Sequence, residues 1–182
     1  VAYYRREVDA ALAVRPHLRR ASAGESIPDF TPDTAKSFTR GESEYFFAGK
    51  RPGVASFDTP KAVGEYVGRV VRVEKNRFRL DRGGLLAAGD GICFLTDRGF
   101  AGTNVNAADG DCVTPNRMEG IVPGTEVYRN YDHRFNQLLA RSRTRRVIPA
   151  SVLVEAMAGG VRFSYTDCEG VTASAARSVA LE

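Results

Sequence analysis

The chain has 182 residues, of which 43% are hydrophobic, and it carries a formal net charge of +4. This is enough apolar chain for one folded domain or two small ones. No apolar run approaches the roughly 20 residues that cross a bilayer, so a membrane-spanning helix is excluded. The sequence starts at Val1 without a signal peptide. We therefore expect a cytoplasmic piece of a longer protein, whose last pair, Leu181-Glu182, fits either a native end or a cloning scar.

The first third of the chain predicts one helix followed by irregular structure. Apolar residues recur at helical spacing over residues 2–14, and Arg15-Pro16 ends this helix because a residue before proline avoids the helical region. Residues 15–63 are rich in proline and glycine. They are expected to be irregular, with one helical turn near Glu42–Phe47.

The middle of the chain predicts short strands at roughly ten-residue spacing. Val67, Val71 and Val73 alternate with other residues as in a half-buried strand, and Asp109-Gly110 is a hairpin signal. The remaining strands are expected at 77–81, at 91–96 and within GIVPGTEVYRN. The pattern indicates a mainly β fold with a small antiparallel β-barrel over residues 64–130.

After this barrel the sequence predicts a short helix with Asp132 as its N-cap, and then a basic linker. Residues 131–146 form this section. Three further strands are expected in a second, smaller β unit at 147–182. The sequence leaves open whether this unit is truncated before it is complete. With the helix and tether at 1–63, the chain therefore divides into four sections.

Basic residues gather in two stretches. One has no acidic residue within it and contains Arg134, Arg141, Arg143, Arg145 and Arg146. The other, from Lys61 to Arg82, mixes seven cations with three acidic residues. Such clusters can neutralise phosphates of RNA or another polyanion, or they can be solvated faces whose arginine stems cover apolar surface. Both interpretations stay open.

No set of residues in the sequence has the pattern of a catalytic or metal site. His17 and His133 have no partner motif, and neither a GxSxG nucleophile motif nor a glycine-rich phosphate loop occurs. The three cysteines form no CxxC pair, so neither a disulfide framework nor a zinc site is expected. We assign no catalytic residue and no metal ligand to this chain, and whether it is itself an enzyme stays open.

Several motifs resemble one known family. YYRREVDAAL and the segment from Phe38-Thr39-Arg40-Gly41 to Tyr45-Phe46-Phe47-Ala48-Gly49-Lys50 resemble the end of the catalytic region of peptidase family U thirty-two, the collagenase-like proteases. VGRVVRV, LLAAGDGICF and GIVPGTEVYRNYDHRF resemble the C-terminal accessory region of its longer members. Those members include the bacterial type that hydroxylates a cytidine of ribosomal RNA. The β region is also similar in pattern to the barrel in domain two of translation elongation factors.

The resemblance implies that catalysis, and any iron–sulfur cluster, belongs to a barrel domain of the parent protein upstream of Val1. It implies no cofactor here. We expect Arg40, Tyr45, Phe46 and Phe47 to dock onto that domain, although these aromatics can instead pack on the chain's own β-barrel. The leading hypothesis is an accessory module that contacts ribosomal RNA or another polyanion. The alternatives are a peptide-binding region of a collagenase-like protease and a purely structural brace.

Overall fold

The computed structural model describes residues 1–49 and 55–178. Lys50, the last residue of one family motif, and the terminal pair Leu181-Glu182 lie outside them. The chain forms two compact units. One is continuous, Pro32–Arg141, and the other combines Val1–Thr31 with Ser142–Glu182. The four sections expected from the sequence stay a prediction.

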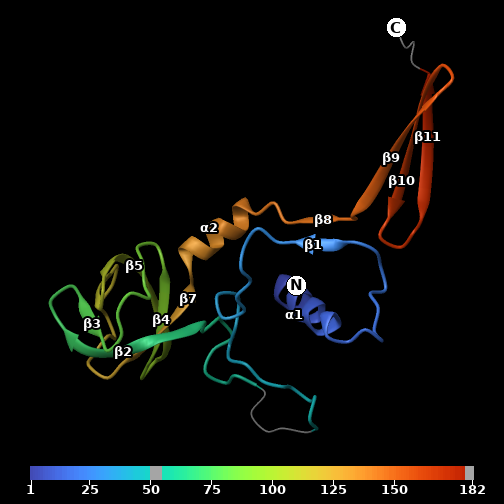
Figure 1. Cartoon of the computed structure of the whole chain (residues 1–182). Helices are drawn as coiled ribbons and strands as arrows, with labels where there is room; N and C mark the ends of the chain where they lie inside the picture. Colours follow the sequence, from blue (N-terminus) through green and yellow to red (C-terminus); the bar gives the residue numbers. More distant parts are fainter. Residues whose placement is uncertain (50–54, 179–182) are drawn as a thin grey trace. The chain divides into compact units, whose positions relative to one another are not determined.

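The continuous unit is built around a closed antiparallel barrel (Figure 1). Around the barrel the strands follow the order β2-β3-β6-β5-β4-β7. In chain order they are β2 (Glu65–Val73), β3 (Phe78–Leu80), β4 (Gly91–Thr96), β5 (Gly99–Asp109), β6 (Cys112–Pro115) and β7 (Glu126–Tyr131). Helix α2 (His133–Arg141) follows directly. The predicted fold class, mainly β with a small barrel, is confirmed.

The barrel encloses one apolar core. Its fully buried members include Phe78 and Phe94 from opposite parts of the strand order, together with Val67, Val70, Ile92, Val105, Val113 and Val127. Because side chains alternate along a strand, β3, β6 and β7 bury every second residue toward this core. Burying these groups is the main favourable term that holds the barrel together.

Strand β2 departs from the alternation that its sequence predicts. Val67 and Val70 are buried, whereas Val71 is 56% exposed. Its pairing register shifts between Tyr66 and Gly68 and again between Val70 and Arg72. These bulges bend β2 so that it pairs with both β3 and β7, which closes the barrel. The expected inward position of Val71 is therefore wrong.

The discontinuous unit contains one helix and two small sheets. Helix α1 (Ala2–Ala13) forms as predicted and has no buried residue. β1 (Glu25–Ile27) pairs with β8 (Arg145–Val147) as a two-stranded ribbon. β9 (Ala150–Met157), β10 (Gly160–Asp167) and β11 (Thr172–Ser178) form an antiparallel sheet in the order β11-β10-β9.

The β9–β11 sheet has one apolar and one polar face. Its register places Tyr165 opposite Val152, and Phe163 between Val154 and Ala175. On the other face, hydroxyl groups pair across the strands, as in Ser164–Ser174 at 2.9 Å. The apolar face is open, since Val152 is 52% and Val154 56% exposed.

Two local expectations need correction. The helical turn expected near Glu42–Phe47 is a pair of hydrogen-bonded turns, in which the Phe47 N–H donates to the Glu44 carbonyl and the Gly49 N–H to that of Phe46. The supposedly irregular stretch 15–63 also contains β1. Among the described residues, neither helix is long and apolar enough to cross a membrane.

Candidate nucleic-acid interface

Helix α2 carries the first two residues of the predicted arginine cluster, Arg134 and Arg141. It begins as predicted, because Asp132 Oδ1 accepts a hydrogen bond of 2.8 Å from the Phe135 N–H. Such a cap satisfies one of the free backbone donors of the first turn. Among the apolar side chains of α2, Phe135 is buried, whereas Leu138 is 45% exposed. Phe135 thus anchors the helix, while the rest of α2 faces outward.

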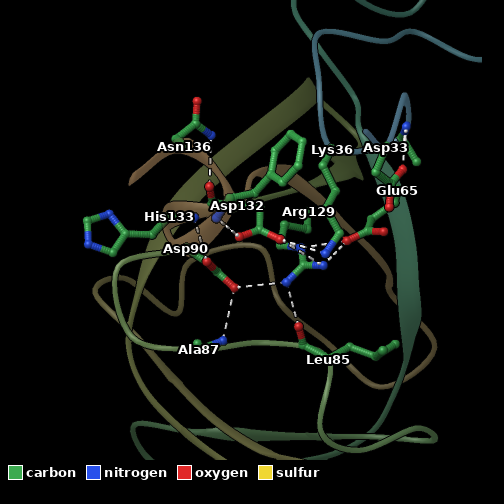
Figure 2. Close-up of polar contacts among 12 residues, drawn as sticks. Asp33, Lys36, Glu65, Leu85, Ala87, Asp90, Arg129, Asp132, His133 and Asn136 are labelled. Carbon is green, nitrogen blue, oxygen red and sulfur yellow. Dashed lines mark hydrogen bonds and ion pairs between the residues drawn. The ribbon is translucent and has the colours of Figure 1, made fainter. Parts of the chain in front are cut away.

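A buried charge network fixes the start of α2 on the barrel (Figure 2). Arg129 of β7 donates to Glu65 Oε1 of β2 at 2.6 Å, and its Nη1 lies 3.3 Å from Asp90 Oδ2. Its Nη2 lies 3.3 Å from Asp132 Oδ2. Asp90, fully buried, accepts 2.9 Å bonds from the backbone N–H groups of Ala87 and His133. One guanidinium therefore joins two barrel strands to the first residues of the helix.

Lys36 ties the segment before the barrel into the same network. Its Nζ lies 3.1 Å from Asp132 Oδ2 and 5.9 Å from the centre of the Phe135 ring. Burial by itself would raise the pKa of Asp132. The Phe135 N–H, Lys36 and Arg129 favour the carboxylate more strongly, so the pKa is lowered. Asp132 is thus held ionised as both a cap and an ion-pair partner.

The α2 arginines have no counter-charge of their own. Within residues 1–49 and 55–178, neither Arg134 nor Arg141 has an ion-pair or hydrogen-bond partner for its guanidinium. Arg134 also lines a cavity of about 420 Å³ between α2 and the loop before β4. Lys36, Leu85 and Leu138 line the same cavity. The outer side of α2 therefore offers positive charge without an ion-pair partner, beside a cavity with both charged and apolar walls.

The second basic stretch behaves differently, because most of its arginines are neutralised within the barrel. Arg69 pairs with Glu126 at 2.7 Å and Arg79 with Asp111 at 2.9 Å. Glu74 pairs with Arg77. The hydrogen bond from Arg77 is the main reason why the pKa of Glu74 is lowered, and the charges of Arg72 and Arg79 add to it. The interpretation of this stretch as a solvated, structural face fits these pairs.

The other three residues of the arginine cluster belong to the discontinuous unit. Arg143 and Arg145 have no side-chain partner among the described residues. Arg146 is engaged, since its Nη2 donates to Ser22 Oγ at 3.0 Å and to the Ala23 carbonyl. Asp29 holds the same segment through the Arg143 N–H at 2.6 Å. The structure therefore gives Arg146 a role in local folding that the sequence does not reveal.

The aromatic residues that we expect to dock onto the catalytic domain are exposed in this chain. Tyr45 is 62%, Phe46 50% and Phe47 94% exposed. Tyr45 and Phe46 meet edge to face with ring centres 4.3 Å apart. Arg40 donates to the Pro60 carbonyl at 3.1 Å and lies 5.3 Å from the Phe38 ring centre. These rings do not pack into the barrel core, which disfavours the alternative that they cover their own β-barrel.

The described residues contain no group of three or more His, Cys, Asp or Glu side chains that could hold a metal ion. Cys93 is buried, and this burial raises the pKa of its thiol to about 11. Its Sγ lies 3.3 Å from the Val63 carbonyl. Cys93 is thus a packed structural thiol and a poor nucleophile.

Sequence reasoning missed Arg129, Asp90 and Glu65, which hold α2 in place. One signal was available. Val127 and Arg129 are two apart in β7 and point to the same side, and Val127 is fully buried. An inward-pointing arginine requires carboxylate partners. The sequence does not predict which carboxylates pair with Arg129, because Glu65 and Asp90 come from distant segments of the chain.

Comparison with known proteins gives one informative similarity. No protein-family profile and no solved structure matches this chain. The chain is similar to the 23S rRNA 5-hydroxycytidine C2501 synthase of Escherichia coli (strain K12), with 32% identity over 180 residues. The match covers 94% of this chain but 28% of the relative, so the chain spans less than a third of that protein's length. The similarity supports the expected link to the RNA-hydroxylating type and gives no support to a collagenase-like protease.

Proposed function

We propose that this chain is a non-catalytic accessory region that contacts RNA for an RNA-modifying enzyme. The contacts are made by Arg134 and Arg141 of α2 and by Arg143, Arg145 and Arg146 of the segment that follows. Catalysis, and any iron–sulfur cluster, would belong to the rest of the parent protein, in the cytoplasm. Ribosomal RNA is the substrate class that the name of the relative suggests.

One observation carries this proposal: the two arginine-rich stretches differ in their counter-charges. In the barrel, arginines pair with carboxylates at distances such as 2.7 Å for Arg69–Glu126. Arg134, Arg141, Arg143 and Arg145 have no such partner in the described part of the chain. Unpaired arginines can replace the counterions of a polynucleotide, which makes phosphate contact favourable.

The test is the salt dependence of RNA binding by the whole chain. We expect Arg134→Gln/Arg141→Gln to weaken binding to a ribosomal RNA fragment. It should also flatten the plot of log affinity against log salt by about 0.7 for each lost contact with single-stranded RNA. The matched control is Arg69→Gln/Arg79→Gln, which removes two arginines that are already paired. Equal effects of the two double variants would contradict the proposal, as would a wild-type chain that binds no RNA.

A second candidate function, bracing the catalytic domain, is favoured by the exposed aromatics. Each ring buried on docking would contribute about 2 kcal/mol. We propose that Arg40, Tyr45, Phe46 and Phe47 contact that domain. In a pull-down between this chain and the separately expressed catalytic domain of its parent, Phe47→Ala should weaken capture. Phe57→Ala, a ring that is 92% exposed in the same tether, should not. Capture that is insensitive to Phe47 and Tyr45 would remove this candidate.

A further inference from the structure

Two neighbouring cavities form one groove on the barrel. They have volumes of about 430 Å³ and 260 Å³. Both are lined by Gly102, Thr103 and Arg117, so they adjoin along β5. This groove, lined by residues 91–92, 94, 96–104, 116–117, 119–120 and 130, is here called the β5 groove. It does not include α2 or any residue of the arginine cluster.

The groove exists because β5 is longer than its partner β6. The paired register between them ends at Val105 opposite Pro115, and one more backbone bond of 2.7 Å runs from the Asn116 N–H to the Asn104 carbonyl. In the described part of the chain, the preceding β5 residues 99–103 pair with β4 alone. The chain after β6 stays close through a 3.0 Å bond from the Arg117 N–H to Thr103 Oγ1, and then turns away. One edge of β5 is therefore left open beneath a loop.

The walls of the groove carry polar side chains with no internal partner. Asn104, Asn116 and Asn130 are exposed, and none of their side-chain amides makes a hydrogen bond within the described residues. The guanidinium groups of Arg98 and Arg117 likewise have no partner there. Phe100 is half-buried and adds an aromatic surface.

The groove has no net charge, because Asp97 and Glu119 balance Arg98 and Arg117. Attraction of phosphates therefore cannot be its main property. Amides, carboxylates and guanidinium groups in one concavity instead match the donors and acceptors on the edges of bases. An aromatic ring adds a surface on which a base can stack.

We propose that the β5 groove binds the bases of a single-stranded RNA segment. The proposal rests on the proposed function, since it takes RNA as the ligand of this chain. It assigns the two kinds of RNA contact to different residues. The α2 arginines contact phosphates, whereas Phe100 and the asparagines of the groove contact bases. Phosphate contacts position an RNA, and base contacts select its sequence.

An extended peptide is the competing occupant, because an open strand edge can accept another strand. RNA is favoured by the side chains. Strand addition uses backbone groups and needs pockets for alternate side chains, and it gives no role to three unpaired asparagine amides. The experiment below makes the peptide an explicit outcome.

The test uses the whole chain and short unstructured homopolymers of adenylate, cytidylate and uridylate. Phe100→Ala is expected to weaken the preferred homopolymer roughly 5- to 150-fold, the usual cost of losing one stacked base. Because Phe100 is half-buried, Asn104→Ala/Asn116→Ala provides a second variant at exposed positions, and it should reduce the preference between homopolymers. The controls are Leu95→Ala on β4 and Asn106→Ala on β5, both exposed and outside the groove.

The salt dependence separates this proposal from the proposed function. Groove variants should keep the wild-type slope of log affinity against log salt, whereas Arg134→Gln/Arg141→Gln should reduce it. If the groove variants lose affinity for RNA and the arginine variant does not, the groove proposal is supported and the proposed arginine interface is refuted. If the groove variants bind every homopolymer like wild type, the groove proposal is overturned while the arginine interface stands.

Amide signals of Gly102 and Thr103 provide the second measurement. Adding the preferred homopolymer should shift both signals in NMR spectra. No shift on saturation with RNA, or a shift only with an extended peptide, would overturn the proposal, the latter in favour of strand addition.

Discussion

Replacing Asp132 by alanine is expected to loosen α2 from the barrel. Its side chain is 6% exposed and lies 3.1 Å from Lys36 Nζ and 3.3 Å from Arg129 Nη2. Loss of the helix cap costs about 1 kcal/mol. Breaking a buried ion pair costs about 3–5 kcal/mol when one charge is left uncompensated. Since Glu65 and Asp90 remain beside Arg129, we expect a total loss of about 2–4 kcal/mol in the free energy of unfolding.

Urea unfolding followed by circular dichroism measures this loss, because the chain has no tryptophan for fluorescence. Asp132→Asn keeps an oxygen that can cap Phe135 and removes only the charge, so it should lose less. Asp97→Ala, an exposed aspartate in the β4–β5 turn, is the control and should change the midpoint little. An Asp132→Ala protein with the wild-type midpoint would refute the network as the anchor of α2.

The pH dependence gives a further check on the same residue. Burial opposes ionisation of Asp132, but the Phe135 N–H and the nearby cations lower its pKa in the folded protein. Stability from this group is therefore fully present above the unfolded pKa of about 3.9, and it is lost as pH falls through the folded pKa. The stability difference between wild type and Asp132→Asn should shrink below about pH 4. A difference that stays constant with pH would assign the effect to packing.

Three further predictions concern the barrel and its cysteines. Phe78→Ala should cost about 3–5 kcal/mol in urea unfolding, because Phe78 is fully buried in the core. Gly64→Ala should lower the midpoint far more than Gly110→Ala. Both glycines have positive φ, but a Cβ at Gly64 would lie 1.9 Å from the Arg129 carbonyl oxygen and one at Gly110 meets open space. Alkylation near neutral pH should modify exposed Cys168 before buried Cys93, and the reverse order would show that the barrel opens readily.

The barrel could be predicted because its strands are bounded by local signals. The Asp109-Gly110 turn and the apolar run ICFL mark β4, β5 and β6 without reference to the rest of the chain. β1 and β8 could not be predicted, because three residues show no periodicity and their pairing joins Ile27 to Arg145 across more than half of the sequence. Val71 was misplaced for a similar reason, since the bulges in β2 arise from closing the barrel.

The sequence predicts which arginines belong to the candidate interface, but it does not predict which of them are paired in the folded chain. The arginine cluster is visible as a run of like charge, and the cap at Asp132 follows from its place before a helix. Whether a given arginine is paired depends on which carboxylates the fold brings near. Arg69 contacts Glu126, and Arg146 contacts Ser22, only because segments distant in the sequence come together in the fold. The uncompensated charge of Arg134 and Arg141 is therefore a property of the folded chain.

The open apolar face of the β9–β11 sheet affects how the chain behaves in concentrated solution. Valine and tyrosine side chains that are about half exposed there, such as Val154 at 56% and Tyr165 at 49%, stay in contact with water. Water is released when two such faces meet, so crowding many copies together favours clustering. Light scattering should accordingly rise with protein concentration, and replacing Val152 and Val154 by threonine should suppress it while the strands stay paired.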